Sequence, residues 1–334
     1  MSKSDGDSGD LLRDAAQRGI RYRQTSAQRG VAPTDEAVAA VQRFVEPLPD
    51  SGIAGQDTLA LLDEVGSPAA VAMTGPRFFG FVIGGSYPVT LATNWLAAAW
   101  DQNVGMHEVT PAAATLEQVA LDWMVDLLGM PEGTGCGFVT GATVANFTAL
   151  AAARHRVFTN AGWNVESHGL IGAPPVSVVI GAEAHPTLTK SLGLLGLGRD
   201  DVTRVPVDDQ GRMIASEMPE VDGPTIVCTQ AGNVNTGAFD PIGEICDRVR
   251  PQGGWVHVDG AFGLWAAASA AHRGQIAGFE RADSWATDAH KWLNAPYDCG
   301  VTICARGEHL RRSMSMEAAY VETCLLYTSP SPRD

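Results

Sequence analysis

Lys291 stands in the string DAHKW, within a mostly apolar stretch that also contains Trp285, Trp292 and Leu293. An amine that is withdrawn from water loses its proton more readily, so it can act as a nucleophile or form a Schiff base with a carbonyl compound. Most lysines are solvated surface charges instead, and these neighbours alone leave both interpretations open.

Asp259 ends the apolar string WVHVD and is followed by small residues. A carboxylate in this position is either a turn or helix cap, or an acid at the carboxyl end of a strand that faces a ligand. An ionised carboxylate beside a pyridine nitrogen keeps that nitrogen protonated, and the pyridinium then accepts electrons from a carbanion.

The string GFVTGATVAN predicts a strand that passes through a short turn into a helix. Gly141 and Ala142 allow a ligand to approach the backbone, and Thr143 offers a hydroxyl and an amide at the helix N-terminus, where a phosphate is favoured. Because the string lacks both the GxGxxG pattern and a Walker lysine, it does not indicate a dinucleotide or a nucleoside triphosphate.

Together these strings supply an amine, an acid for a ring nitrogen and a phosphate cradle, the three groups that pyridoxal 5'-phosphate requires. His185, in the string GAEAHP, is either a helix cap or an imidazole stacked on a flat aromatic ligand. We expect no metal site.

Strands whose carboxyl ends share one edge of a sheet would gather these residues. Short β-branched segments alternate with helices, which predicts a mainly parallel sheet with helices on both faces. The predicted strands are Gly137–Thr140, Val176–Ile180, Val202–Val205, Thr225–Thr229, Trp255–Val258 and Gly300–Ala305, and the helices between them include Val144–Phe158, Pro186–Leu197 and Pro241–Arg250.

The first part of the chain is predicted to be helical. Residues 11–70 are amphipathic, with breaks where prolines and glycines gather. A helix is expected over about 90–104, and the next one has Thr110 as its N-cap and Gly129 at its end.

The composition excludes several classes of protein. The 334 residues carry a formal net charge of -15, so nucleic-acid and membrane-surface partners are not expected. No apolar run is long enough for a transmembrane helix. None of the six cysteines forms a CxxC pair, which favours reduced thiols and a cytoplasmic protein.

On these residues the sequence resembles the group II pyridoxal-dependent amino-acid decarboxylases, which include the aromatic-amino-acid, glutamate and diaminobutyrate enzymes. The resemblance runs from about Pro76 to Ala319, and HVDGA and HKW are its most specific strings, with Asp259 and Lys291 32 positions apart (291 − 259). The other matching strings are PRFFGF, SYPVTLATNWLAAAWDQN, GFVTGATVANFTALAAAR, AEAHPTLTKS, AGNVNTGAFDPI and DAHKWLNAPYDCG.

The resemblance implies a role for each matching residue. Lys291 would form the Schiff base, Asp259 would pair with the ring nitrogen, and His185 would stack on the cofactor and assist catalysis. The remaining roles are phosphate contact for His290, Ala142 and Thr143, cofactor contact for Ala261 and Asn233, and the substrate side for Phe79, Tyr87 and Pro88.

Three departures from the family pattern stand out. Asp288 occupies a position where many members have asparagine, and a carboxylate near a phosphate is unfavourable unless it is protonated or turned away. Asn233 stands where many members have threonine, and asparagine can still donate a hydrogen bond. The family continues into a mobile loop with a catalytic tyrosine, a role that we do not assign to Tyr320.

The resemblance implies the type I aminotransferase-like fold of pyridoxal-phosphate enzymes, with the small C-terminal domain missing. We expect a disordered lead-in (1–10), a helical segment that helps to form a homodimer (11–75), a large cofactor-binding domain (76–323) and a non-native tail (324–334). The tail CLLYTSPSPRD resembles a translated sequencing adaptor, so the natural protein is expected to continue beyond Thr323.

The implied activity is decarboxylation of an L-amino acid to the amine and carbon dioxide through a Schiff base on Lys291. Three alternatives stay open: an aminotransferase that uses the same cofactor, an inactive cofactor-binding or scaffold protein, and a fragment that fails to fold. The sequence does not identify the amino acid.

Overall fold

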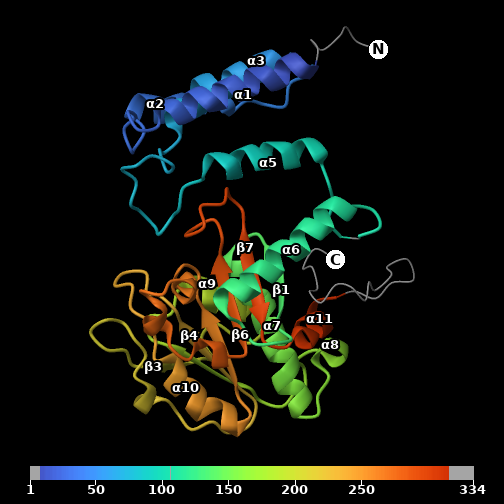
Figure 1. Ribbon diagram of the computed structural model, residues 1–334, viewed down its shortest axis with the longest axis vertical. Coiled ribbons are helices and arrows are strands. Elements are labelled where there is room, and N and C mark those ends of the chain that lie inside the picture. The colour runs from blue at the N-terminus through green and yellow to red at the C-terminus, as the bar shows by residue number, and fades with distance from the viewer. Residues whose placement is uncertain (1–7, 106, 316–334) are drawn as a thin grey trace. The chain divides into compact units, whose positions relative to one another are not determined.

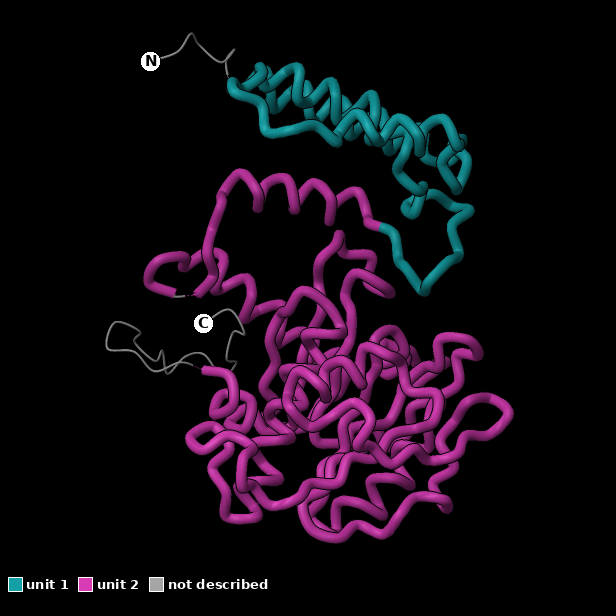
Figure 2. The backbone as a smooth tube through the Cα atoms, turned by 180° about the vertical axis from the view of Figure 1, so that it is seen from behind, with its two compact units in different colours: residues 1–85 teal, residues 86–334 magenta. Residues whose placement is uncertain are grey.

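The computed structural model describes residues 8–105 and 107–315. The chain divides into two compact units, residues 1–85 and 86–334 (Figure 2). This division falls ten residues beyond the boundary expected after residue 75 (85 − 75). Tyr320 and the tail 324–334 lie outside the described residues.

The smaller unit is helical, as predicted for residues 11–70. Its first helix begins at Ser8, inside the segment expected to be a disordered lead-in, and Asp10 in its first turn pairs with Arg13. Arg18 also pairs with Asp63 over 3.1 Å, which joins the first helix to a later one. The elements are α1 Ser8–Thr25, α2 Asp35–Ala40, η1 Val41–Phe44, α3 Gly55–Leu61, η2 Leu62–Gly66 and α4 Ser67–Ala69.

The larger unit begins with two helices, α5 Pro88–Trp100 and α6 Pro111–Leu128. Thr110 is the N-cap of α6, and Gly129 ends the helix with a φ of +66°, a conformation that glycine adopts readily, as predicted. The helices that follow are α7 Ala142–Asn160, α8 Val165–His168, α9 Pro186–Leu194, α10 Ile242–Val249 and α11 Gly307–Met314.

A seven-stranded sheet lies at the centre of the larger unit, with the strand order β1-β7-β6-β5-β4-β2-β3 (Figure 1). Only β7 runs antiparallel to its neighbours, so the mainly parallel sheet is confirmed. The strands are β1 Gly135–Val139, β2 Ser177–Gly181, β3 Thr203–Val205, β4 Thr225–Gln230, β5 Trp255–Asp259, β6 Ser284–Asp288 and β7 Gly300–Cys304.

Six of these strands were predicted, and β6 was not. Its sequence, SWATD, lacks the β-branched run that signals a strand. Every residue of β6 is nevertheless buried, because the strand pairs with β5 on one side and β7 on the other. Tertiary position therefore decides its conformation.

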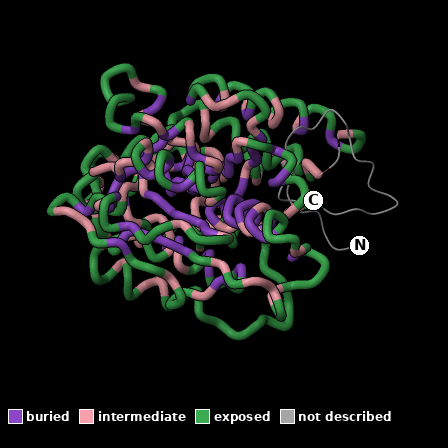
Figure 3. Tube along the Cα trace, turned by 90° about the horizontal axis from the view of Figure 1, so that it is seen from below, coloured by how far each residue is buried: buried purple, intermediate pink, exposed green. Residues whose placement is uncertain are grey.

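Alternate strand residues feed two apolar layers, one on each face of the sheet. Val227 and Val256 pack with α6 and α10, whereas Ile226 and Trp255 pack with α7, α9 and α11. The buried residues accordingly gather in the interior of this unit (Figure 3). Both faces are covered, as expected for a parallel sheet of this class.

Two further observations concern the described residues. None of their helices is both long and apolar enough to cross a bilayer. The five cysteines among them, Cys136, Cys228, Cys246, Cys299 and Cys304, are free thiols, and Cys324 lies outside.

Candidate active site

Two aspartates end two neighbouring parallel strands and position the candidate site. Asp259 is the last residue of β5, and Asp288 is the last residue of β6. The backbone N–H of Asp288 donates to the carbonyl of Ala261 over 2.9 Å, which ties the two strand ends together. Lys291 follows three residues later, and its Nζ lies 3.3 Å from Asp288 Oδ2. The pairing of β5 with β6 therefore brings the predicted amine and the predicted acid to one edge of the sheet.

Asp259 is almost fully buried, and two donors hold its carboxylate. Asn146 Nδ2 donates to Oδ2 over 3.1 Å, and the backbone N–H of Ala261 donates to Oδ1 over 3.2 Å. Burial raises the pKa of the Asp259 carboxyl, while these hydrogen bonds and the charges of His185 and Lys291 oppose the rise. An ionised carboxylate here is stabilised by a cationic ligand group such as a pyridinium.

Asn146 belongs to a chain of buried side chains behind Asp259. Trp255 Nε1 donates to Ser284 Oγ over 2.9 Å, and Ser284 Oγ lies 2.9 Å from His257 Nδ1. His257 Nε2 lies 2.8 Å from Asn146 Oδ1. An indole N–H can only donate, and Asn146 turns its amide nitrogen toward the carboxylate, so His257 must donate from Nε2 and accept at Nδ1. Burial keeps this ring neutral by lowering its pKa to about 3.

The turn before α7, predicted to hold a phosphate, holds a carboxylate of the chain itself. The backbone N–H of Ala142 donates to Asp288 Oδ1 over 2.6 Å. Asp288 Oδ2 lies 3.3 Å from Lys291 Nζ and 3.6 Å from His290 Nε2. A helix N-terminus and two basic side chains thus surround one anion, which is the environment that the sequence predicted for a phosphate.

The surroundings of Lys291 differ from the expectation of an apolar enclosure. Trp292 and Leu293 are 70% and 37% exposed, and among the three apolar neighbours only Trp285 is buried. The Lys291 side chain retains 21% of its exposure and is paired with Asp288. The chain leaves the sheet after β6 in a turn, so closeness in sequence does not enclose the amine.

His290 is fixed on both sides. Its Nδ1 accepts the backbone N–H of Cys299 over 3.1 Å, and its ring stacks on Tyr297 with 4.1 Å between the ring centroids. Burial lowers the pKa of the imidazole, and the nearby charge of Asp288 opposes this effect. The ring is therefore held with Nε2 directed at the anion position.

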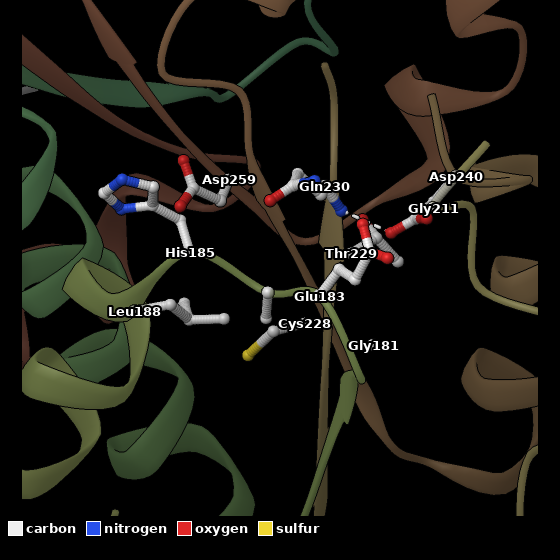
Figure 4. Close-up of a pocket in the computed structure, with 11 residues that line it drawn as sticks. Gly181, Glu183, His185, Leu188, Gly211, Cys228, Thr229, Gln230, Asp240 and Asp259 are labelled. Carbon is white, nitrogen blue, oxygen red and sulfur yellow. Dashed lines mark hydrogen bonds between the residues drawn. The ribbon is translucent and has the colours of Figure 1, made fainter. Parts of the chain in front are cut away.

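His185 lies beside Asp259 on the wall of a pocket that is formed by the ends of β2, β4 and β5 (Figure 4). It is the N-cap of α9, because its Nδ1 accepts the backbone N–H of Thr187 over 3.3 Å and lies 2.7 Å from the hydroxyl of the same residue. The cap interpretation is confirmed. It also orients the ring on the pocket wall, where a flat ligand could stack.

The remaining residues that were predicted to contact the cofactor are Thr143, Asn233 and Ala261. The Thr143 carbonyl accepts a hydrogen bond from Ser191, which ties the start of α7 to α9. Asn233 is buried and donates to Glu183 Oε2 over 3.0 Å, so its amide serves the loop rather than an open pocket. Ala261 follows Asp259 directly.

The three predicted substrate-side residues fall in both units. The backbone N–H of Tyr87 donates to the carbonyl of Asn294 over 3.2 Å, which places Tyr87 next to the segment that follows Lys291. Pro88 is the first residue of α5. Phe79 lies in the smaller unit, where it is 90% exposed.

These residues fit a bound pyridoxal phosphate in three respects: an amine within reach, a buried acid that forms no salt bridge with any described residue, and an anion-binding turn. Close backbone packing supports the turn, since a Cβ added to Gly300 would lie 2.5 Å from the Cα of Gly141. The fit requires Asp288 to give up or share the amide of Ala142.

Asn146, His257 and Ser284 were missed in the sequence. The strings TVANF and WVHVD each carry a polar residue where an apolar one would serve the core, and that mismatch was the available signal. The sequence alone could not show that these residues pair, because His257 and Asn146 are 111 positions apart (257 − 146).

The chain is similar to known pyridoxal-dependent decarboxylases over most of its length. The model of the pyridoxal-dependent decarboxylase conserved domain matches residues 65–328. The acidic amino acid decarboxylase of Bos taurus is 32% identical over 255 residues, which is 74% of this chain and 48% of that protein. The cysteine sulfinic acid decarboxylase of Mus musculus is 31% identical over the same length, 51% of that protein.

Solved structures agree. The crystal structure of mouse CSAD superposes with a TM-score of 0.84 at 27% identity, over 94% of this chain and 68% of that one. The structure of Oryza sativa TDC with PLP and tryptamine superposes with a TM-score of 0.85 over 97% and 69%, and its 22% identity supports the fold alone. The chain belongs to the pyridoxal-dependent decarboxylase family. It spans about half the length of the curated relatives that it matches.

Proposed function

We propose that this chain binds pyridoxal 5'-phosphate at Lys291 and is the cofactor-binding part of an enzyme that removes the α-carboxylate of an L-amino acid as carbon dioxide. The observation that carries the proposal is the placement of Lys291 and Asp259 at the ends of two adjacent strands, beside an anion-binding turn. Family membership supports it.

Each residue has a defined task in this proposal. When bound, the cofactor supplies the electron sink for the carbanion that remains after carbon dioxide leaves. Lys291 would hold the cofactor through its side-chain amine. Asp259 keeps a proton on the ring nitrogen, and Asn146 and Ala261 orient that carboxylate. The turn at Ala142 and the ring of His290 bind the phosphate, and His185 covers one face of the ring.

Borohydride trapping tests this assignment directly. The chain contains only three lysines, Lys3, Lys190 and Lys291, so peptide mapping can assign an adduct without ambiguity. After addition of pyridoxal phosphate and reduction, we expect a phosphopyridoxyl group on Lys291. The adduct should disappear in Lys291→Ala and persist in the control Lys190→Ala. A folded chain without an adduct on Lys291 would rule out the proposal.

Product analysis of the full-length protein separates the activities. The relatives are named for acidic amino acids and cysteine sulfinic acid, so L-glutamate, L-aspartate and cysteine sulfinate come first, followed by aromatic amino acids. Carbon dioxide with the amine supports decarboxylation. A 2-oxo acid without carbon dioxide would indicate an aminotransferase, and cofactor binding without turnover would indicate a scaffold.

A further inference from the structure

A second cavity lies at the opposite edge of the sheet from Asp259 and Asp288. It is lined by the last turn of α7, by residues just before β5 and β6, and by residues just after the antiparallel strand β7. Five-residue β5 begins at Trp255 on this cavity and ends at Asp259. At about 3.3 Å per residue, the two sites are roughly 13 Å apart along the strand. The cavity is therefore separate from the candidate active site.

The lining of this cavity is positively charged, whereas the chain as a whole is negatively charged. Arg156, Arg250 and Arg306 line it, and Asp283 is the one carboxylate among the lining residues. Arg250 Nε lies 3.3 Å from Asp283 Oδ1, so one positive charge is balanced and about two remain. The C-terminal end of α7 contributes only about half a negative charge. A chain with a formal net charge of -15 thus concentrates positive charge at this point.

A buried histidine, His309, is one of the residues that line the cavity. The His309 side chain is only 10% exposed, and neither ring nitrogen has a hydrogen-bond partner among the described residues. The closest carboxylate, that of Glu308, is 3.9 Å from Nε2. The ring lies 5.9 Å from the rings of Trp255 and His155, which hold it in place. Because an unpartnered buried polar group is destabilising, a polar ligand that reached this ring would be stabilising.

We propose that this cavity binds a small oxyanion of the size and charge of phosphate, either free or as the phosphate group of a metabolite. Its volume of about 170 Å³ is several times the ~30 Å³ share of a water molecule. Guanidinium groups match the oxygens of a phosphate in geometry and charge. The side-chain amide of Asn160 adds a neutral donor to the lining, and the ring of His309 belongs to the same lining.

Thermal unfolding with rising inorganic phosphate, at constant ionic strength, tests the proposal. Phosphate should raise the melting temperature of the chain in a saturable way. Arg306→Gln and Arg156→Gln should each weaken the binding about tenfold, which corresponds to ~1.4 kcal/mol. Arg312→Gln is the matched control, because it removes an equal charge from the same helix as His309 outside the lining residues.

Equal stabilisation of all four proteins would overturn the proposal, because phosphate would then be binding elsewhere, for example at the turn before α7. A second measurement does not depend on unfolding. Nitrogen-15 resonances of the His309 ring should shift when phosphate is added, and unchanged resonances at saturating phosphate would also overturn it. Comparison of inorganic phosphate with phenyl phosphate identifies the source: tighter binding of the ester indicates a metabolite, and tighter binding of the free ion indicates phosphate itself.

Discussion

Asp288 is the side chain on which the candidate site differs most from its sequence-based expectation. Its carboxylate accepts the Ala142 amide and lies near both Lys291 and His290. A phosphate at this turn must compete with that carboxylate for the same donors, and two anions at one helix N-terminus repel each other.

We therefore expect Asp288→Asn to bind pyridoxal phosphate more tightly, by about tenfold or ~1.4 kcal/mol. The asparagine keeps the size of the side chain and its acceptor oxygen while it removes the charge. Titration of the visible absorbance of the bound cofactor measures the affinity, with Asp209→Asn as a control on an exposed turn. Weaker binding in Asp288→Asn would mean that the charge helps to position Lys291 instead.

A second prediction concerns His257 and the pH dependence of the free energy of unfolding. Its pKa is lowered from 6.5 to about 3 by burial, so between these pH values the unfolded chain binds a proton that the folded chain does not. The stability that this neutral ring contributes is present above pH 6.5 and is lost as the pH falls. The expected loss in free energy of unfolding between pH 7 and pH 5 is about 2 kcal/mol from this group.

His257→Gln should remove that share of the acid sensitivity, because glutamine does not titrate. Urea unfolding of the cofactor-free chain at pH 7 and pH 5 gives the two free energies, and the variant should lose about 2 kcal/mol less than the parent protein. His272→Gln, an exposed histidine, is the matched control. An identical pH dependence in parent and variant would contradict the buried neutral ring.

The antiparallel strand β7 packs against the turn before α7, at Gly141. Gly300 packs so closely on Gly141 that an added Cβ would meet the backbone at 2.5 Å. Backbone cannot move aside as a flexible side chain can, so the turn itself would have to shift.

Gly300→Ala should therefore destabilise the chain by about 1–3 kcal/mol and also weaken cofactor binding. Chemical unfolding and the absorbance titration measure the two effects separately. Gly274→Ala serves as control, because its added Cβ would meet nothing within 4 Å. A variant with normal stability and normal affinity would show that the turn tolerates the displacement.

Helix α6 has two apolar faces, and only one of them is used inside its unit. Leu121, Met124 and Leu128 are buried against the sheet, whereas Leu116, Trp123 and Leu127 are 57%, 72% and 51% exposed. The sequence predicted this helix from its N-cap Thr110 and its end at Gly129, and tertiary packing decided which of its faces is buried. Exposed apolar patches of this kind mark interaction surfaces.

For the molecule as a whole, we propose that a second copy of the chain covers this face of α6, in a homodimer. Light scattering should give twice the mass of one chain for the parent protein and a single-chain mass for Trp123→Glu. Glu64→Gln, a charge change in the smaller unit, should leave the mass unchanged. A parent protein that is monomeric at high concentration would contradict the proposal.

The sequence by itself determined the parallel sheet, most of its strands and the chemical groups of the site. Alternation of β-branched strands and helices has few stable solutions, and Asp259 and His185 follow predicted strands whose carboxyl ends such a sheet must bring to one edge. Those inferences depend on local patterns, which one sequence contains in full.

Only the tertiary structure decided what surrounds each group. It made SWATD a central strand, placed Asp288 on the amide of Ala142, and linked Trp255 to Asp259 through Ser284, His257 and Asn146. These contacts join residues that are far apart in the chain, and the donor, acceptor or charge that each side chain faces is set by packing rather than by its neighbours in sequence. The same holds for the cavity around His309, whose three arginines come from three separate segments.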